Sequence, residues 1–249
     1  SDDTSIKLWD LETGSELRRF GGTLSPVNTV AVSPDGRYAA SGSSDKGVRL
    51  WDLARGGQAR FLAGHEVRIV GGGGREPFVV GRKEGAGHSG AVRTVVFSPD
   101  GQHLITGSSD GTAKVWDVPS GNEVGSFPEF ERWQLPQITS IDLSPGGRFA
   151  LVGGSGRSAV FYEVETGRYL SPLRSPDDAS TDYQPEEDSA YAVAYSANGR
   201  HALTAGGGWH YSGEGTIKLW EVSTGEEIRT FEGETSGIRD IAFSPNDRF

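Results

Sequence analysis

The feature that most constrains this chain is a motif of about forty residues that recurs along it. In its clearest copy, residues 87–118, three short runs rich in Val, Ile, Thr, Leu and Phe are separated by the turns Pro-Asp-Gly and Ser-Asp-Gly. Apolar runs between such turns predict three antiparallel strands and no helix. Similar turns begin at Ser33, Ser144 and Ser196, and fragments of the motif stand at both ends of the sequence.

A repeat of this length with Gly-His and Trp-Asp signatures marks one four-stranded propeller blade per copy. Along nearly its whole length the chain therefore resembles the WD-repeat (β-transducin repeat) β-propeller family, and its turn sequences are similar to those of bacterial WD-repeat proteins. The resemblance implies an all-β propeller of four-stranded antiparallel blades over residues 1–249. About five blade units are expected, four with complete inner strands plus split terminal pieces, within a larger seven-bladed ring.

The two ends of the sequence carry incomplete blades. Residues 1–22 are expected to form the third and fourth strands of a split blade. Residues 238–243 are expected to form the first strand of a blade that the sequence does not finish. Because a blade buries its faces only against its neighbours, these units are parts of one fold and not separate domains.

Extra length is confined to three places, residues 63–90, 172–190 and 206–215. Elsewhere the interval from turn serine to closing aromatic residue is constant at 18 (33 to 51, 98 to 116, 144 to 162). In an antiparallel blade the loops that carry the extra length leave the same face of the propeller. Since variable loops on a rigid scaffold usually carry binding surfaces, that face is the expected binding face.

Two sets of residues match the structural tetrad of the family, in which a loop His, a strand Ser or Thr, a turn Asp and a Trp hydrogen-bond through the blade. They are His88, Thr106, Asp110 and Trp116 in the third blade, and Ser41, Asp45 and Trp51 in the second. The fourth blade departs from the pattern with Val152 and Tyr162. A catalytic triad is the alternative for His with Thr and Asp, but the Trp and the repetition favour the structural role.

The insertion at residues 66–87 holds two short apolar runs around the glycines at 71–74, which predicts a projecting hairpin. A phosphate-binding glycine loop is the alternative, but it needs a following helix N-terminus, and the sequence predicts none.

The other two insertions hold the candidate partner-contacting residues. An acidic run includes Asp177, Asp178 and Asp182, and it is either a solvated loop or a contact for a basic partner. The ligand spacing of a calcium loop is missing from it. The sequence favours two alternatives about equally for Trp209, His210 and Tyr211: they anchor an interface, or they pack locally. The same two alternatives hold for Trp133.

Composition excludes several classes of function. A formal net charge of −10 argues against nucleic-acid binding, which needs clustered Lys and Arg. The chain has no cysteine, so thiolate metal sites and disulfides are excluded. No apolar run is long enough to span a membrane, and no metal-ligand, cofactor or nucleophile motif is present. We expect no catalytic residue, no cofactor and a cytoplasmic protein.

The predicted function is a non-catalytic scaffold that binds proteins or peptides, with the sensor or docking module of a larger signalling protein as its expected setting. The alternative is a propeller enzyme or small-ligand binder that uses the central channel. That alternative requires titratable residues on the innermost strands, where the sequence offers Asn28, Arg93, Asp142 and Arg239.

Overall fold

The computed structural model describes residues 2–21, 23, 25–63, 87–127, 137–155, 157–173, 189–206, 215–234 and 238–248. All regular secondary structure in these residues is β-strand. The strands form four four-stranded antiparallel sheets and one two-stranded sheet, which confirms the predicted all-β fold of propeller blades.

We number the sheets as blades 1 to 5 in chain order. Blade 1 holds β1 (Ile6–Trp9) and β2 (Glu16–Phe20). Blade 2 holds β3 (Val27–Val32), β4 (Tyr38–Ser43), β5 (Val48–Asp52) and β6 (Gly57–Ala63). Blade 3 holds β7 (Val92–Phe97), β8 (His103–Ser108), β9 (Ala113–Asp117) and β10 (Glu123–Phe127). Blade 4 holds β11 (Ile138–Leu143), β12 (Phe149–Gly154), β13 (Arg157–Glu163) and β14 (Arg168–Pro172). Blade 5 holds β15 (Ala190–Tyr195), β16 (His201–Gly206), β17 (Gly215–Glu221) and β18 (Glu226–Glu234).

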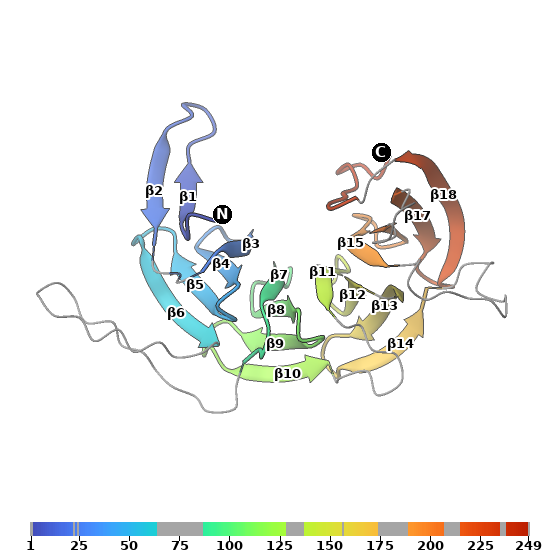
Figure 1. Cartoon of the computed structure of the whole chain (residues 1–249), viewed down its shortest axis with the longest axis horizontal. Coiled ribbons are helices and arrows are strands. Elements are labelled where there is room, and N and C mark those ends of the chain that lie inside the picture. Colours follow the sequence, from blue (N-terminus) through green and yellow to red (C-terminus); the bar gives the residue numbers. More distant parts are fainter. Residues whose placement is uncertain are drawn as a thin grey trace, which may run out of the picture.

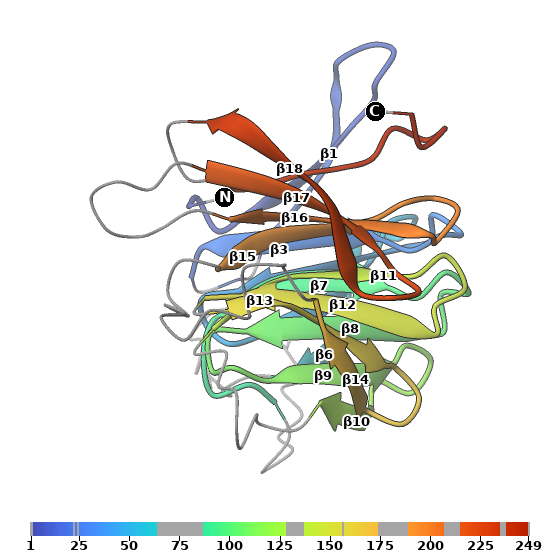
Figure 2. The same cartoon turned by 90° about the vertical axis from the view of Figure 1, so that its right-hand side faces the viewer.

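The blades stand side by side in an open arc (Figure 1). Each four-stranded blade is a meander, with β3, β7, β11 and β15 on the inner side of the arc and β6, β10, β14 and β18 on the outer side. In the view from the side, strands of successive blades run along a common direction and their turns gather at the strand ends (Figure 2). The seven-bladed ring stays a prediction.

The hydrophobic core is divided among the junctions between blades. Between blades 2 and 3, Val48 and Leu50 pack with Val95, Phe97 and Trp116, and all five are almost fully buried. Within the described part of the chain, similar clusters join blades 1 and 2, blades 3 and 4, and blades 4 and 5. Each blade is thus stabilised by burial against its neighbours.

The hairpin between the first and second strands is fixed by its own turn residues. In blade 2, Ser33 donates its hydroxyl to Asp35 Oδ1 (2.6 Å) and accepts the N–H of Tyr38 (2.9 Å). Gly36 takes a φ of 69°, in the left-handed region where a side chain would be strained. The Ser-Pro-Asp-Gly sequence therefore determines this turn locally.

The strand predicted at residues 238–243 is wrong, since residues 238–244 have no regular secondary structure. A strand needs a hydrogen-bonded neighbour, and the sheet of blade 5 contains β15 to β18 alone. The segment is attached instead at its far end, where Asp247 accepts the backbone N–H groups of Ala197 (2.6 Å) and Asn198 (2.9 Å).

Candidate functional site

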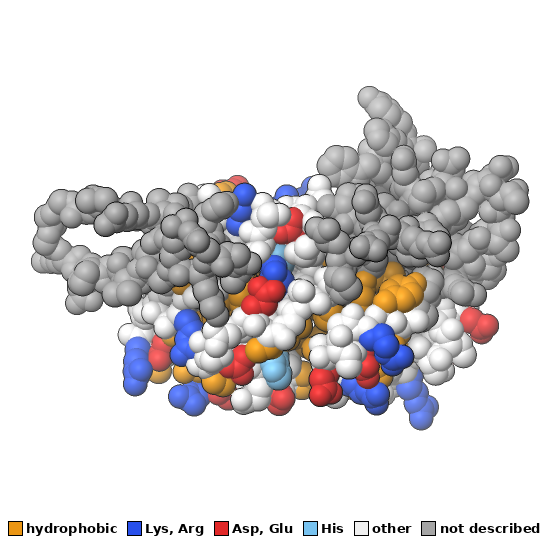
Figure 3. All heavy atoms as spheres, turned by 90° about the horizontal axis from the view of Figure 1, so that it is seen from below, with side chains coloured by type: hydrophobic (Ala, Val, Ile, Leu, Met, Phe, Trp, Pro, Cys, Tyr) orange, Lys and Arg blue, Asp and Glu red, His pale blue; other side chains and the backbone are white. Residues whose placement is uncertain are grey.

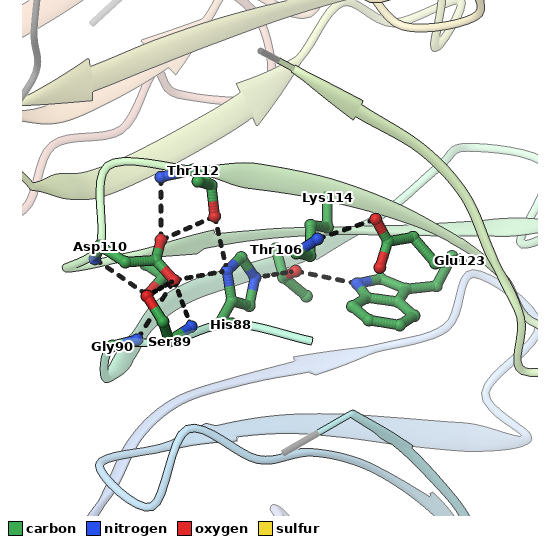
Figure 4. Close-up of polar contacts among 10 residues, drawn as sticks. His88, Ser89, Gly90, Thr106, Asp110, Thr112, Lys114 and Glu123 are labelled. Atoms are coloured by element: carbon green, nitrogen blue, oxygen red, sulfur yellow. Dashed lines mark hydrogen bonds and ion pairs between the residues drawn. The ribbon is translucent and has the colours of Figure 1, made fainter. Parts of the chain in front are cut away.

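Blade 3 contains a continuous line of buried polar side chains (Figure 4). Trp116 on β9 donates its indole N–H to the hydroxyl of Thr106 on β8 (2.9 Å), and this hydroxyl lies 2.7 Å from Nε2 of His88. On the other side of the imidazole, Nδ1 lies 3.0 Å from Thr112 Oγ1 and 3.5 Å from Asp110 Oδ2. The structure thus brings together the four residues that the sequence assigned to the tetrad of this blade.

The bonding pattern assigns the protons along this line. An indole N–H can only donate, so Thr106 accepts from Trp116 and directs its own hydroxyl proton to Nε2 of His88. An ionised carboxylate can only accept, so the imidazole proton lies on Nδ1, the nitrogen that faces Asp110. Thr112 donates its hydroxyl to Asp110 Oδ1 (2.6 Å) and can accept from Nδ1. Each of these buried groups has a partner.

Asp110 also holds the loop that leads into β7. Its Oδ2 accepts the backbone N–H groups of Ser89 (2.6 Å) and Gly90 (3.1 Å), and its Oδ1 accepts that of Thr112 (2.9 Å). Burial by itself would raise the pKa of Asp110, but hydrogen bonds from His88 and Thr112 hold that pKa well below its ordinary value. The carboxylate is therefore ionised at neutral pH and ties the loop to the sheet.

This arrangement does not support a catalytic triad. A nucleophilic hydroxyl must reach a substrate, yet Thr106 is fully buried and His88 is only 5% exposed. The Thr106 oxygen is also already an acceptor for Trp116. The chemistry that these groups can perform is to satisfy one another inside the blade.

Blade 2 keeps the bond from Trp to hydroxyl but pairs its turn aspartate differently. Trp51 donates its indole N–H to Ser41 Oγ (2.9 Å). Asp45 forms a two-pronged ion pair with Arg49 (2.7 and 3.1 Å), whose side chain is 7% exposed. The histidine position of blade 3 is 18 residues before the hydroxyl residue (88 to 106), and its counterpart here (23 to 41) is Thr23. The Arg49 guanidinium therefore neutralises the carboxylate in a blade without the imidazole.

Blades 4 and 5 show two simpler versions. In blade 5, Trp220 donates its indole N–H to Thr204 Oγ1 (2.9 Å). In blade 4, Val152 stands at the hydroxyl position and is fully buried. There Tyr162 replaces the Trp and stacks on Phe127 of blade 3 with ring centroids 4.8 Å apart. Burial raises the pKa of the Tyr162 phenol, and the residue at the hydroxyl position of this blade is the apolar Val152.

Sequence reasoning missed a second recurring pair, which joins the third and fourth strands of a blade. Its members are Lys7–Glu16 (3.9 Å), Lys114–Glu123 (2.8 Å) and Lys218–Glu227 (3.5 Å). The signal is in the sequence, since each Lys stands two residues before the Trp and each Glu seven after it (114, 116, 123 in blade 3). In blade 2 these positions hold Arg49 and Gln58, so Arg49 has no glutamate opposite it and binds Asp45.

Two of the four polar residues expected to face the channel connect neighbouring blades instead. Asn28 on β3 donates its side-chain N–H to the carbonyl of Val92 on β7 (2.9 Å). Asp142 on β11 accepts the backbone N–H of Tyr195 on β15 (2.7 Å). Burial raises the pKa of Asp142 in spite of its backbone donors. The other two residues are exposed: Arg93 and Arg239.

The candidate partner-contacting residues lie outside the described part of the chain: Trp133, Asp177, Asp178, Asp182, Trp209, His210 and Tyr211. Residues 66–86 of the first insertion lie outside it as well. The strand ends that flank the insertions are described. In blade 5, the cross-strand pairs of Gly206 with Ala190 and with Thr216 place the flanks of two insertions at one end of the sheet. In blade 2, Ala63 pairs with Val48 at the corresponding end.

These ends lie on the same face of the arc in successive blades. The second strand of blade 2 ends against the start of β7, because a Cβ on Gly42 would lie 2.4 Å from Cγ1 of Val92. Gly107 has the same relation to Ile138 at the start of β11, at 2.5 Å. First strands of neighbouring blades therefore run in the same direction, and we call the face where they start the insertion face.

Two classes of feature are absent from the part of the chain that the structure describes. No three His, Cys, Asp or Glu side chains there are grouped so that they could hold a metal ion. No helix there is long and apolar enough to cross a bilayer.

Parts of the chain are similar to known proteins. A sequence model of the family described as "WD domain, G-beta repeat" matches residues 14–52, 82–117 and 225–249. The chain is 27% identical over 92% of its length to "Guanine nucleotide-binding protein subunit beta" of Oryza sativa subsp. japonica, covering 53% of that protein. It is 26% identical over its whole length to "Nuclear distribution protein nudF" of Aspergillus niger, covering 52% of that protein. The chain thus spans about half the length of the curated relatives that it matches.

Proposed function

We propose that this chain of WD40 repeats is a non-catalytic scaffold that presents its insertion face to protein or peptide partners. The observation that carries the proposal is the strand register, because the described flanks of the insertions lie at the same end of their blades. Variable loops on a rigid framework are the usual carriers of binding surfaces. The relatives named as a subunit support a role within protein assemblies.

Within that face, we assign the anchoring role to aromatic residues and the steering role to carboxylates. Interfaces draw most of their energy from a few aromatic or Arg side chains, whereas charges at the rim mainly set the association rate. Trp209 and Tyr211 are therefore the proposed anchors, and His210 and Trp133 are further candidates. The acidic run around Asp177 is proposed to attract a basic partner.

The test is partner capture from a lysate of the source organism by the intact chain and by variants. We expect Trp209→Ala or Tyr211→Ala to weaken capture by about 1 to 3 kcal/mol, and neutralisation of the acidic run mostly to slow association. A matched control alters the turns at residues 13–14 and 224–225, which lie at the opposite strand ends. Loss of partners in the control, with capture retained in the insertion variants, would contradict the proposal.

The enzyme alternative depends on polar side chains of the innermost strands, and within the described residues two of the four candidates bond to neighbouring blades. Asn28 and Asp142 form hydrogen bonds with neighbouring blades, so these side chains stabilise the fold. The likeness to bacterial WD-repeat proteins, the cytoplasmic location and a place as sensor or docking module in a larger signalling protein are proposals that rest on the repeat sequences. The relatives compared above are from a plant and a fungus.

A further inference from the structure

A groove at the junction of blades 2 and 3 lies on the face opposite the insertion face. Its volume is about 610 Å³, and its walls include the first hairpin turn of blade 2, the turn before β6, and residues near Gly101 and Pro119 of blade 3. The cross-strand pair Tyr38–Asp52 marks this end of blade 2, whereas Gly42–Val48 marks the insertion end. A ligand in the groove would therefore occupy a surface separate from the proposed insertion-face site.

The inner wall of the groove is apolar. It includes Tyr38 and Leu50 from blade 2 and Val118 and Pro119 from blade 3. Leu50 and Val118 are nearly buried, while Pro119 is exposed and Tyr38 is partly exposed. The Arg37 guanidinium lies 5.5 Å from the centroid of the Tyr38 ring, so a cation and an aromatic surface stand together.

The side chains that line the groove carry a net positive charge, whereas the chain as a whole is negative. Three arginines line it, Arg37, Arg55 and Arg60, against two aspartates, in a chain whose formal net charge is −10. On the outer surface of the arc, basic and acidic side chains are interspersed over the described residues (Figure 3). A local excess of arginine in an acidic protein favours an acidic ligand.

The side chains of the two aspartates accept hydrogen bonds within their own turns. Asp35 Oδ1 accepts the Ser33 hydroxyl (2.6 Å) and the Arg37 N–H (3.0 Å). Asp52 Oδ1 accepts the N–H groups of Ala54 (3.0 Å) and Arg55 (2.7 Å). Their geometry is set by these backbone donors, and the Arg55 side chain remains 89% exposed although its Nε lies 3.9 Å from Asp52.

Blade 4 shows how the same turn is arranged when its arginine is neutralised. Arg148 stands four residues after the turn serine at 144, as Arg37 does after Ser33, and it forms an ion pair with Glu163 (3.0 Å). The position of Glu163 is taken by the shorter Asp52 in blade 2. Within the described residues no carboxylate lies within 4.0 Å of the Arg37 guanidinium, so its fork is open to a ligand.

We infer that this groove binds an acidic peptide segment of a protein partner. A Glu or Asp carboxylate pairs with Arg37 or Arg55, and a neighbouring apolar side chain covers the wall formed by Tyr38 and Pro119. Arginine is suited to this because its planar fork matches a carboxylate with two parallel hydrogen bonds. A nucleic-acid backbone fits less well, since phosphate binding needs clustered Lys and Arg, and the groove holds three arginines against two aspartates.

The inference is tested by fluorescence anisotropy with labelled octapeptides of alternating Glu and Leu, alternating Lys and Leu, or alternating Ser and Leu. The full chain should bind the Glu-Leu peptide at least tenfold more tightly than the other two. The double variant Arg37→Gln/Arg55→Gln should lose at least tenfold in affinity for it, with an unchanged thermal midpoint. Charge reversal with Arg37→Glu should shift the preference toward the Lys-Leu peptide.

The matched control is Arg200→Gln/Arg229→Gln in blade 5, which removes the same charge and includes the same turn position. It should retain the affinity of the wild-type chain. Equal loss in both double variants, retained affinity in the groove variant, or tighter binding of a labelled oligo-dT than of the Glu-Leu peptide would overturn the inference. The insertion variants of the proposed function keep the groove intact, so failure of one proposal is distinguishable from failure of the other.

Discussion

At the scale of single residues, the buried polar line of blade 3 is a stabilising device because each member satisfies its neighbours. Thr106 is its centre, with bonds to both the indole of Trp116 and the imidazole of His88. A buried group that loses its partner keeps the full cost of its desolvation. The same hydroxyl position in blade 5 is Thr204, which is bonded to Trp220.

We therefore expect Thr106→Val to lower the free energy of unfolding by about 1 to 3 kcal/mol, because it leaves two buried nitrogens without a partner. The matched variant Thr204→Val should cost less, since within the described residues one nitrogen depends on that hydroxyl. Midpoints of denaturant unfolding measure both. Equal costs would contradict the central role of Thr106.

A second residue-scale prediction concerns acid. The pKa of Asp110 is depressed in the folded chain, so its contribution to stability is present above the ordinary carboxyl pKa of about 4. It is lost as the pH falls through the folded value. The stability difference between wild type and Asp110→Asn should thus be largest near neutral pH and shrink below about pH 4. Thr106→Val removes no titrating group, so the stability that it costs should change less over the same pH range. Denaturation at several pH values measures both variants.

At the scale of strands, the third and fourth strands of a blade are joined by charge as well as by the backbone ladder. Three blades use Lys and Glu, but blade 2 has Gln58 in place of the Glu and directs Arg49 inward to Asp45. The two differences in blade 2 are connected, because Arg49 pairs with the Asp45 carboxylate, which has no imidazole beside it. Blade 2 is consequently held by a more buried ion pair than the pair at the edge of blade 3.

We expect Arg49→Met to lower the free energy of unfolding by about 3 to 5 kcal/mol, since it leaves the Asp45 carboxylate almost buried without its counter-ion. The control Lys114→Met breaks the more exposed pair with Glu123 and should cost about 1 kcal/mol or less. Urea denaturation of the two variants decides the matter. A cost for Lys114→Met as large as that for Arg49→Met would show that burial is not the cause.

At the scale of the whole molecule, the arc leaves one face of blade 2 partly uncovered. Val30 and Val32 on β3 are 55% and 58% exposed, whereas their counterparts on β7, Val95 and Phe97, are 6% and 7% exposed. The difference arises because Val95 and Phe97 pack on blade 2, while blade 1 has two strands in the structure. A larger ring would cover these valines. We propose that the chain is part of such a ring.

We predict that the isolated chain self-associates through this apolar face. The double variant Val30→Thr/Val32→Thr should reduce association in sedimentation velocity without lowering the free energy of unfolding. The matched change Val95→Thr should instead destabilise the fold by about 1 to 3 kcal/mol, because it places a hydroxyl in a dry junction. Unchanged association of the double variant would point to another surface.

Much of this architecture was determined by the sequence itself, because it depends on short-range rules. Turn residues such as Ser33 and Gly36 fix hairpins through their own hydrogen bonds and backbone angles, and the repeat imposes the same blade on each segment. The residues of the tetrad in blade 3 were also predictable, since they recur at constant spacing. The Lys and Glu pairs recur at constant spacing as well.

What the tertiary structure alone decided depends on contacts between blades and on the presence of a neighbour. Residues 238–243 have the sequence of a strand, yet they form none, because a strand requires a partner for its backbone groups. Asn28 and Asp142 look like channel residues but bond to the next blade. The partner of Arg49 and the open fork of Arg37 likewise follow from distances between side chains, which no sequence interval specifies.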